Sequence, residues 1–348
     1  MQALVQPCDG VAPLVSGIKD AKKSVEMVIF RFDEREIEQA LEMAVARGVF
    51  VHALIAYTNG GGEKNLRKIE ARLLAAGVTV ARTADDLARY HDKLMIIDRE
   101  ILYIMTFNYT HLDIQHSRSL GLVTKNQQIV QEAVKLFEAD TTRQPYIPGQ
   151  DNFIVSPVNA RKELSAFIKG AQKQLLIYDG KLTDSQIIRL LQERARSGVE
   201  VRVIGKLGKR GAGINAVKLS GLRLHAQAII RDGAQIFVGS QSLRKAELDV
   251  RREVGLITND PKVVKRFLVT FEADWSLSDS VKQSIEQKNE APVALAALVK
   301  EAVKDVVKGV VVEAGVAALE VKKEMKEAVQ EAVKEAVKEA VNETKPNN

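Results

Sequence analysis

The sequence has little cysteine and few aromatic residues. Cys8 is the single cysteine in 348 residues, Trp275 is the single tryptophan, and aromatic side chains make up 5% of the chain. One cysteine cannot form a disulfide within the chain, which is usual for proteins of a reducing compartment. The fold must therefore be held by an apolar core, for which a hydrophobic content of 46% is sufficient.

Two kinds of long apolar segment are also missing. No run approaches the roughly 18 apolar residues that a membrane-spanning helix requires. The first residues, MQALVQPCDG, lack the basic and then apolar pattern of a signal peptide. We therefore expect a cytoplasmic protein, with peripheral contact to a membrane as the alternative. The net charge of +6 favours anionic partners such as phosphate groups, lipid headgroups or nucleic acid.

The chain contains an internal duplication. Two pairs of segments align with an offset of 150 residues and two with an offset of 134, namely 18–30 with 168–180, 37–55 with 187–205, 89–98 with 223–232, and 120–124 with 254–258. The order of the segments is the same in both copies, so we interpret the chain as two halves of one design. We place the first half at residues 1–146, the second at 147–280 and a tail at 281–348.

Each half alternates between helical and strand-like patterns. Ser16 and Ser165 are expected to begin a helix that leads into an apolar strand. A second amphipathic helix ends at a glycine, as in 37–48, and a further strand follows it. The glycine-rich stretches 59–65 and 205–213 are expected to be loops. This alternation predicts an α/β fold of two pseudo-symmetric halves, each a mostly mixed β-sheet flanked by helices, followed by a long C-terminal helical tail.

The tail differs in composition from the two halves. Residues 281–348 contain no arginine, and their last part repeats a four-residue unit of the kind KEAV. Apolar side chains recur every four residues from Met325 to Val341, so the apolar stripe winds slowly around a helix. Two interpretations remain open. The tail is either a solvated, partly packed amphipathic helix, or a helix that lies on a membrane surface or self-associates.

One short motif carries the chemistry and occurs in both halves. Each copy has a histidine, a polar residue two positions later and an aspartate five positions after that, and these are His91, Lys93 and Asp98 in the first copy and His225, Gln227 and Asp232 in the second. Further along, each copy has a hydroxyl side chain and another polar side chain, which are Thr106 and Asn108 and then Ser240 and Ser242. A lysine and an imidazole on one face of a strand, joined by hydroxyl and amide donors, suit a phosphate oxyanion. One histidine can attack phosphorus while the other protonates the leaving oxygen.

These motifs resemble the signature of the phospholipase D superfamily, His-x-Lys-x4-Asp followed by Gly-Ser/Thr-x-Asn, and the resemblance covers roughly residues 5–275. It implies a metal-independent phosphodiesterase or phosphatidyltransferase that needs no cofactor and works through a phosphohistidine intermediate. It also implies that His91 is the nucleophile and that His225 is the acid and base. The other roles that it implies are phosphate binding by Lys93 and Asn108, a site lining of Thr106 and Ser240, structural aspartates at Asp98 and Asp232, and a histidine-orienting carboxylate at Glu253.

The two copies depart from this signature at several positions. Gln227 stands where a second lysine is expected and Ser242 where a second asparagine is expected, and we place both among the substrate-binding side chains. In the first copy, Met105 replaces the glycine and Ser119 replaces the histidine-orienting glutamate. Gln227 keeps a hydrogen-bond donor but loses a charge that stabilises an oxyanion. The sequence thus leaves open an active phosphodiesterase or a degenerate module that binds phosphates without turnover.

Three further histidines lie outside the two motifs. We expect His52 to be a packed strand residue and His111 and His116 to lie at the mouth of the site, where a metal site with Asp113 matches no strong template. The preferred substrate is a phospholipid phosphodiester, because no aromatic platform for stacking bases is evident. A nuclease of the same superfamily, a phosphatidyl-transfer enzyme and a phosphate-binding scaffold are the alternatives. The sequence does not decide the oligomeric state.

Overall fold

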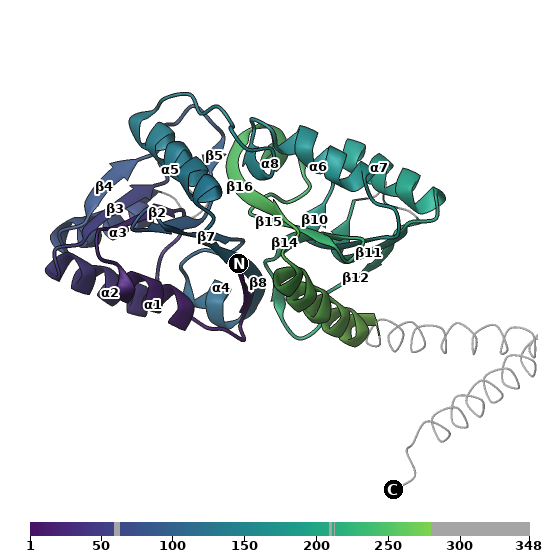
Figure 1. Cartoon of the computed structure of the whole chain (residues 1–348), viewed down its shortest axis with the longest axis horizontal. Coiled ribbons are helices and arrows are strands. Elements are labelled where there is room, and N and C mark those ends of the chain that lie inside the picture. Colours follow the sequence, from purple (N-terminus) through teal and green to yellow (C-terminus); the bar gives the residue numbers. More distant parts are fainter. Residues whose placement is uncertain (59–62, 209–210, 212, 280–348) are drawn as a thin grey trace, which may run out of the picture. The chain divides into compact units, whose positions relative to one another are not determined.

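The computed structural model describes residues 1–279 apart from 59–62, 209, 210 and 212, and residues 1–279 form one compact unit. Figure 1 shows two β-sheets, each with helices of its own, in purple and blue for the first half and in teal and green for the second. We call residues 1–146 the first half and residues 147–280 the second half, with the boundary as predicted. The predicted tail at 281–348 lies outside the described residues, as do parts of both glycine-rich stretches.

Each half contributes most of one mixed sheet. In spatial order, the strands of the first sheet are β1 (Gln2–Gln6), β8 (Ser117–Thr124), β7 (Ile101–Met105), β6 (Leu94–Ile97), β2 (Ser24–Ile29), β3 (Phe50–Ile55) and β4 (Thr79–Arg82), with β13 (Arg223–Leu224) added at β8. The strands of the second sheet are β12 (Asn215–Val217), β11 (Glu200–Leu207), β10 (Gln174–Leu182), β14 (Gln227–Arg231), β15 (Gln235–Gly239), β16 (Arg251–Thr258) and β5 (Arg89–Tyr90), with β9 (Phe153–Ser156) added at β16. The order of corresponding strands matches in the two sheets, as expected for a duplication.

The helices follow the same repeated plan. Those of the first half are α1 (Ala12–Asp20), α2 (Arg35–Ala46), α3 (Glu63–Ala75), α4 (His111–Gln115) and α5 (Gln127–Thr142), and those of the second are α6 (Ala160–Lys169), α7 (Ser185–Arg196) and α8 (Lys245–Asp249). Residues 261–279 form one more helix. Among the helices described, none is long and apolar enough to cross a membrane.

The predicted fold class is confirmed, but the predicted starts of two helices are wrong. Ser16 and Ser165 lie inside α1 and α6, which begin at Ala12 and Ala160. The first turn of α1 contains Pro13. Backbone N–H groups in a first turn have no acceptor within the helix, so a proline fits there, and the helix begins without a serine cap. The loop predicted at 59–65 is also shorter than expected, because its last residues already belong to α3.

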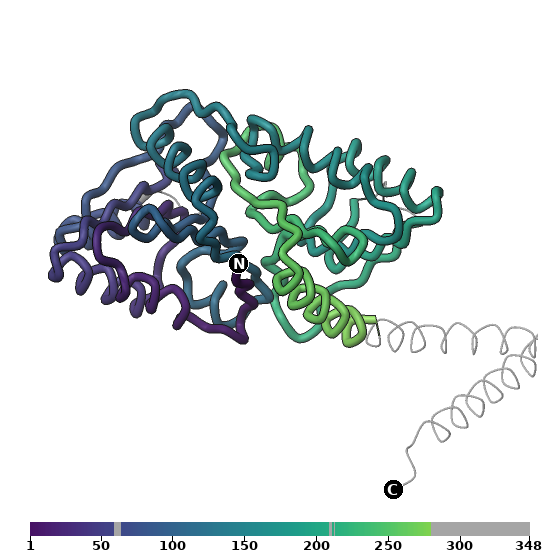
Figure 2. Tube along the Cα trace, in the orientation of Figure 1, coloured from purple at the N-terminus to yellow at the C-terminus, as the bar shows by residue number. Residues whose placement is uncertain are grey.

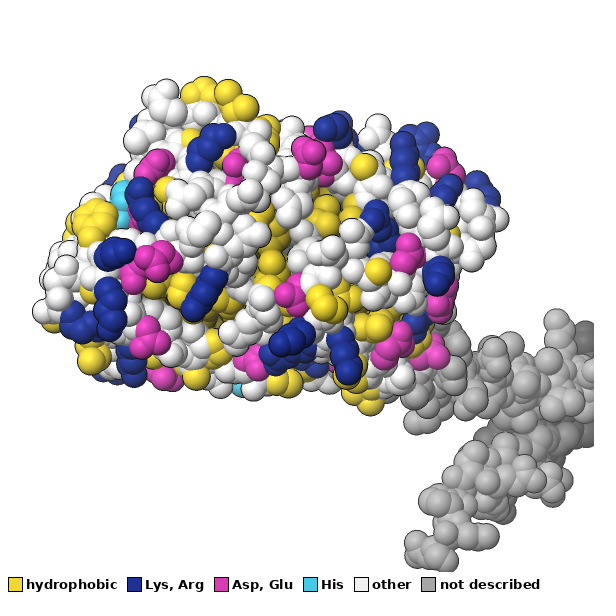
Figure 3. All heavy atoms as spheres, viewed as in Figure 1, with side chains coloured by type: hydrophobic (Ala, Val, Ile, Leu, Met, Phe, Trp, Pro, Cys, Tyr) yellow, Lys and Arg dark blue, Asp and Glu magenta, His cyan; other side chains and the backbone are white. Residues whose placement is uncertain are grey.

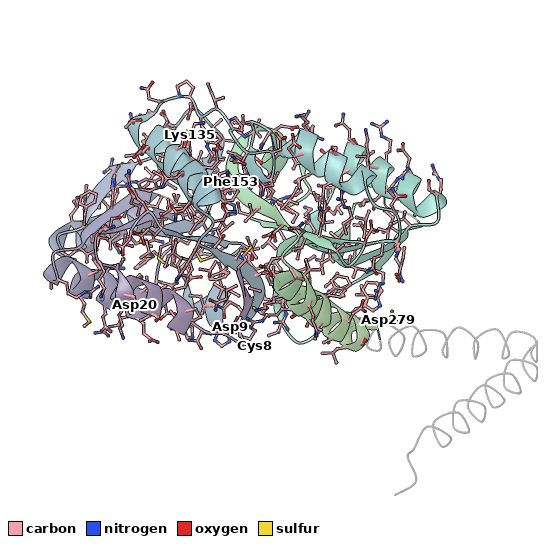
Figure 4. The ribbon with its side chains drawn as sticks, in the orientation of Figure 1. Cys8, Asp9, Asp20, Lys135, Phe153 and Asp279 are labelled. Carbon is pink, nitrogen blue, oxygen red and sulfur yellow. The ribbon has the colours of Figure 1, made fainter. Side chains whose placement is uncertain are left out.

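Each sheet has two buried faces. One face of the first sheet packs with α1 and α2 through side chains such as Leu14 and Ile37, and one face of the second packs with α6 and α7 through Leu164 and Ile187. The opposite faces meet in a core that both halves share. Phe153 is fully buried in this core, and Figure 4 shows it where the two halves meet. Strands covered on both faces require long apolar runs, which explains the near-continuous apolar stretches of the sequence.

The end of the second half returns to the beginning of the chain. Figure 2 shows the helix 261–279 beside the N-terminal segment, and Arg266 of this helix donates to a carbonyl of β1 at 2.7 Å. Further along the helix, Asp274 accepts hydrogen bonds from Arg118 at 2.6 Å and from Tyr178 at 2.7 Å. Arg118 belongs to the first half and Tyr178 to the second, so one buried carboxylate fastens both halves to the last helix.

Two very short strands are exchanged between the halves. β5 of the first half pairs in parallel with β16 of the second, and β13 of the second half pairs in parallel with β8 of the first. Each of them directly precedes a motif histidine. The backbone N–H of His91 donates to the carbonyl of Arg252 at 2.8 Å, and that of His225 donates to the carbonyl of Arg118 at 2.9 Å. Each motif histidine is therefore anchored on the sheet of the other half.

Asp98 and Asp232 hold corresponding turns in the two halves. The carboxylate of Asp98 accepts hydrogen bonds from the backbone N–H groups of residues 22–24 at 2.6 to 3.1 Å. The carboxylate of Asp232 does the same for residues 172–174 at 2.7 to 3.1 Å. Both aspartates have a left-handed backbone, with φ of 56° and 55°, which aspartate tolerates better than most residues. These contacts fit the structural role predicted for both.

We expect Asp98→Ala to lower the free energy of unfolding by about 2 kcal/mol, because backbone donors lose their acceptor and alanine must adopt a left-handed conformation. Asp98→Asn keeps an acceptor oxygen and tolerates this conformation, so we expect it to lose less than half as much. Urea denaturation measures both variants. Wild-type stability in Asp98→Ala would contradict the structural role.

The same contacts predict how this contribution depends on pH. Burial alone would raise the pKa of Asp98, but hydrogen bonds from the backbone of Ser24 and its neighbours outweigh burial and lower it. A carboxyl whose pKa is lower in the folded state contributes stability above its unfolded pKa and loses this contribution as the pH falls. The stability difference between wild type and Asp98→Ala should therefore shrink below about pH 4.

Candidate active site

A pocket of about 420 Å³ lies where the two halves meet, and side chains of both halves border it. The polar residues predicted for the site that border it are His91, Asn108, His225, Gln227, Ser240 and Ser242. The basic residues that border it are Arg31, Arg89, Lys181, Arg223, Arg244 and Arg251. The structure thus brings both copies of the motif to one cavity.

His91 is held by a buried carboxylate of the opposite half. Its Nδ1 lies 2.9 Å from Oε2 and 3.0 Å from Oε1 of Glu253, whose side chain is fully buried. The ring of Phe30 packs edge-on against the imidazole, with ring centres 4.4 Å apart. With Nδ1–H donating to the carboxylate, Nε2 carries the lone pair. Glu253 therefore orients the histidine of the first half, although it belongs to the second.

The surroundings of His91 keep its imidazole neutral. Burial lowers the pKa of His91 well below its usual value, and the ammonium group of Lys93 lowers it further. Burial raises the pKa of Glu253 to about 7, against the opposing effect of Lys93. A carboxylate bound to Nδ1–H makes the other ring nitrogen more basic. A neutral imidazole with this support is the form that can attack an electrophile.

His225 faces a second carboxylate at a longer distance. Its Nδ1 lies 3.5 Å from Oδ2 of Asp113, which is too long for a normal N–H···O hydrogen bond. Burial lowers the pKa of His225, while Asp113 opposes this effect. Burial alone would raise the pKa of Asp113, but His225 and hydrogen bonds from neighbouring groups outweigh burial and lower it to about 2. Asp113 is therefore ionised at neutral pH and stabilises any positive charge that forms on His225.

Asp113 is the carboxylate that sequence reasoning does not assign to a histidine. The family signature predicts it eleven residues after Asn108, where this chain has Ser119, but the structure supplies it five residues after Asn108, in α4. Asp113 is 3% exposed and accepts hydrogen bonds from Asn108 at 2.7 Å and from Arg223 at 2.6 Å. One signal was present in the sequence. Glu247 at the corresponding position of the second half is also acidic, and it accepts a hydrogen bond from the backbone N–H of Ser242 at 2.8 Å, as Asp113 does from that of Asn108 at 2.9 Å.

Lys93 is a buried cation close to both histidines. It is 1% exposed, its ammonium group donates to the carbonyl of His91, and it lowers the pKa of both motif histidines. Burial lowers the pKa of Lys93 itself to about 8. In the second half, Gln227 borders the pocket, and its Oε1 is buried without a hydrogen-bond partner. Lys93 is not among the residues that border the pocket, so the first motif supplies a buried charge, and the second supplies an amide with unused hydrogen-bonding capacity in the pocket wall.

The remaining motif side chains differ in how they meet the pocket. Oδ1 of Asn108 is buried without a partner, and Ser242 donates to the buried carboxylate of Asp179 at 2.6 Å. Thr106 and Ser240 accept backbone N–H groups of β8 and β16 at 3.0 and 3.1 Å. Ser240 borders the pocket, whereas Thr106 does not. Thr106 therefore lies in the strand pairing and not in the pocket wall.

The other histidines lie away from the pocket wall. His52 on β3 packs edge-on against Phe137 with ring centres 5.2 Å apart, in keeping with a packed strand residue. The Nε2 atoms of His111 and His116 are 3.3 Å apart on an exposed surface, and neither residue borders the pocket. In the part of the chain that the structure describes, no group of three or more His, Cys, Asp or Glu is arranged to hold a metal ion.

The chain is similar in sequence to enzymes of two kinds. The polyphosphate kinase of Staphylococcus haemolyticus is 24% identical over 309 residues, which cover 79% of this chain and 42% of the kinase. The mitochondrial cardiolipin hydrolase of Mus musculus is 27% identical over 144 residues, which cover 39% of this chain and 62% of the hydrolase. The chain thus spans less than two thirds of the length of either relative.

A solved structure and a family model match both halves. The phosphatidylserine synthase of Haemophilus influenzae superposes with a TM-score of 0.61 over 79% of this chain and 85% of that one, at 10% sequence identity, and therefore shares the fold. The family model described as cardiolipin synthase, PLD-like domain, matches residues 14–141 and 164–275. These segments contain both histidine motifs and make up most of the chain, so the protein belongs to the family of phospholipase D-like domains, as the sequence motifs predict.

Proposed function

We propose that the protein is a phosphodiesterase that cleaves or exchanges a phospholipid phosphodiester through a phosphohistidine intermediate. The observation that carries this proposal is the pairing of two histidines from opposite halves in one pocket, each with its Nδ1 facing a buried carboxylate. Two relatives by sequence or fold are named for cardiolipin hydrolysis and phosphatidylserine synthesis, which favours a phospholipid.

The first step would form a covalent intermediate on His91. Its Nε2 attacks phosphorus and forms a P–N bond, and the bond from phosphorus to the leaving oxygen breaks. That oxygen takes a proton from His225, which the negative charge of the bound phosphate and of Asp113 helps to keep protonated. Glu253 stabilises the positive charge that develops on His91.

The second step would reverse these roles. A water molecule, or an acceptor alcohol, gives its proton to the neutral His225, its oxygen forms a new bond to phosphorus, and the P–N bond to His91 breaks. Lys93 and the amide of Asn108 are the groups assigned to the non-bridging oxygens of the phosphate. Water yields hydrolysis and an alcohol yields exchange, so one geometry serves both reactions.

A phospholipid is preferred to a nucleic acid because of the residues around the pocket. Phe30 is the one aromatic side chain among the described residues that border it, and it is 4% exposed and packed on His91. Proteins that bind single strands generally offer exposed rings on which bases stack. A membrane contact through residues 281–348 stays a prediction, because these residues lie outside the described part of the chain.

The test compares two leaving groups in the wild type and in His225→Ala, both in EDTA. p-Nitrophenolate leaves readily without a proton, whereas the alcohol of a phospholipid needs one. We expect His225→Ala to slow cleavage of a short-chain phospholipid about 10³-fold, but formation of the intermediate from bis(p-nitrophenyl) phosphate about 10-fold or less. Equal losses on both substrates, or loss of wild-type activity in EDTA, would contradict the mechanism.

The pKa values of the site predict a narrow pH optimum. Glu253 must be ionised to support His91, and its pKa is raised to about 7 by burial. Lys93 must be protonated to bind phosphate, and its pKa is lowered to about 8 by burial. We therefore expect kcat/KM on bis(p-nitrophenyl) phosphate, whose leaving group needs no proton from His225, to rise through about pH 7 and to fall above about pH 8. In Lys93→Gln the alkaline fall should disappear, and its persistence would show that another group causes it.

Restoring the second lysine should strengthen the site. We expect Gln227→Lys to raise kcat/KM about 10-fold, because a neutral contact to the phosphate becomes a charge-assisted one. The matched control is Gln227→Met, which has a similar size but no donor and should lower kcat/KM. Steady-state kinetics on one soluble phosphodiester compares the two variants. Identical rates in both would mean that position 227 does not contact the phosphate.

A further inference from the structure

The pocket carries more positive charge than one phosphodiester needs. Among the described residues that border it are five arginines and Lys181 but a single carboxylate, that of Glu247. On the face of the molecule in Figure 3, by contrast, Lys and Arg side chains are interspersed with Asp and Glu. A phosphodiester has one negative charge, so the excess in the pocket requires another explanation.

The duplication provides an internal reference for this excess. In the first half, the carboxylate of Asp113 is bound by one arginine, Arg223, at 2.6 Å. The corresponding carboxylate in the second half, Glu247, pairs with Arg244 and Arg251, and Arg89 borders the same pocket. Two of these replace neutral residues of the first half, because Thr110 corresponds to Arg244 and Ser117 to Arg251. The second side therefore carries two arginines more than the first, against one additional carboxylate, Glu253, which stands where the first half has Ser119.

The three arginines form one cluster beside His91. Arg89 on β5 and Arg251 on β16 are direct partners in the strand pairing. Arg251 lies 2.9 Å from Glu247 and 4.0 Å from Glu253, the carboxylate that holds His91. Arg244 also pairs with Glu247, while its Nε is buried without a hydrogen-bond partner. Burial lowers the pKa of Arg244, and the neighbouring Arg251 lowers it further, against the opposing effect of Asp179 and Glu253.

We propose that Arg89, Arg244 and Arg251 form an anion subsite that binds a second phosphate group of the substrate, next to the phosphate that reacts at His91. This proposal rests on the proposed function for the position of the reacting phosphate. Guanidinium groups bind phosphate oxygens in a bidentate manner, so the excess of arginine over carboxylate on this side of the pocket suits a phosphate monoester. The substrate class is therefore a phospholipid whose headgroup carries a further phosphate.

The first test measures binding and does not depend on turnover. Calorimetry on the full-length chain compares inorganic pyrophosphate with orthophosphate, in the wild type, in Arg89→Gln and in Arg251→Gln. We expect the wild type to bind pyrophosphate at least about 30-fold more tightly than orthophosphate, and each variant to lose about 10-fold for pyrophosphate but less than about 3-fold for orthophosphate. Arg189→Gln, on the exposed face of α7, is the matched control. Equal wild-type affinities, or equal losses for both ligands, would overturn the proposal.

The second test uses two lipids that differ by one phosphate. Short-chain phosphatidylglycerophosphate and short-chain phosphatidylglycerol have the same reacting phosphodiester, but only the first has a phosphate on its headgroup. We expect the wild type to favour the first about 10-fold in kcat/KM, mainly through KM, and Arg89→Gln and Arg251→Gln to lose this preference. Equal wild-type kcat/KM values would overturn the subsite. If neither lipid is cleaved, the proposed function fails, and calorimetry still decides whether the subsite exists.

Discussion

Turnover of a phosphodiester by the His91→Ala variant is expected to fall at least about 10⁴-fold below that of the wild type. The imidazole of His91 is the one nucleophile of the proposed reaction, and alanine leaves no group that can form the covalent intermediate. Its hydrogen bond to Glu253 at 2.9 Å and the contact of Phe30 with its ring fix the attacking nitrogen in one orientation. The measurement is the steady-state rate on bis(p-nitrophenyl) phosphate in EDTA.

Two controls separate this loss from a loss of structure. His116→Ala removes an exposed histidine that does not border the pocket and should keep wild-type turnover. Thermal unfolding of His91→Ala should show a folded protein, because the pKa of Glu253 is already raised to about 7 and the carboxyl can become neutral when its partner is removed. A folded His91→Ala variant with more than about 1% of wild-type turnover would contradict the role of His91 as the nucleophile.

Asp113→Asn is expected to lower kcat about 100-fold at neutral pH, with a smaller effect on KM. The variant keeps the shape of the side chain but removes the negative charge that faces His225 and binds Arg223. The unpaired guanidinium then opposes protonation of His225. Because Asp113 acts through His225 and raises its pKa, its loss should also move the alkaline limb of the kcat profile on a short-chain phospholipid to lower pH, which a purely structural loss would not cause.

The duplication suggests a rescue of this variant. Ser119 on β8 corresponds to Glu253 on β16, the position from which the second half holds the opposite histidine. Ser119→Glu in the Asp113→Asn background should therefore return a carboxylate to His225 and restore at least about 10-fold of the lost kcat. If the double variant is as slow as Asp113→Asn and remains folded, the carboxylate of Asp113 has a different role.

The sequence predicts the large features of this protein because they depend on repeated local patterns. Apolar strands and amphipathic helices recur at constant offsets, and the two motif aspartates directly follow apolar strands. Their turns close by hydrogen bonds to the backbone of residues 22–24 and 172–174, segments that the repeat also aligns. His91 and His225 occupy corresponding positions of the repeat, so the duplication also predicts that they meet in one pocket.

The pairing of each histidine with its carboxylate could not be predicted in this way, although the resemblance implies that Glu253 orients a histidine. They depend on β5 and β13, strands of two residues each that cross to the other sheet, and two residues give no periodicity to recognise. For this reason the sequence does not reveal that Glu253 serves His91. Asp113 lies on α4, a helix of five residues, and it takes over from a position where the strand carries Ser119. The shift from strand to helix becomes visible only when the backbone is in place.

The arginine cluster shows a different limit of sequence reasoning. Arg89, Arg244 and Arg251 are far apart in the sequence and belong to no motif, and arginines are frequent in this chain. Their role becomes visible only from the comparison with Arg223, Thr110 and Ser117 at corresponding positions, and from the pocket that all three arginines border. The composition gives the net positive charge of the chain but not the place in the fold where basic side chains gather.

The most direct test of the mechanism is the intact mass of the His225→Ala chain after reaction with bis(p-nitrophenyl) phosphate and quenching in alkaline denaturant. In this variant the intermediate forms, because p-nitrophenolate needs no proton to leave, but it is not hydrolysed at the normal rate. We expect a mass increase of one nitrophenyl phosphoryl group, located on His91 by fragmentation and absent from the His91→Ala/His225→Ala chain. An adduct on another residue, or release of p-nitrophenolate with no adduct at any time, would contradict a phosphohistidine at His91.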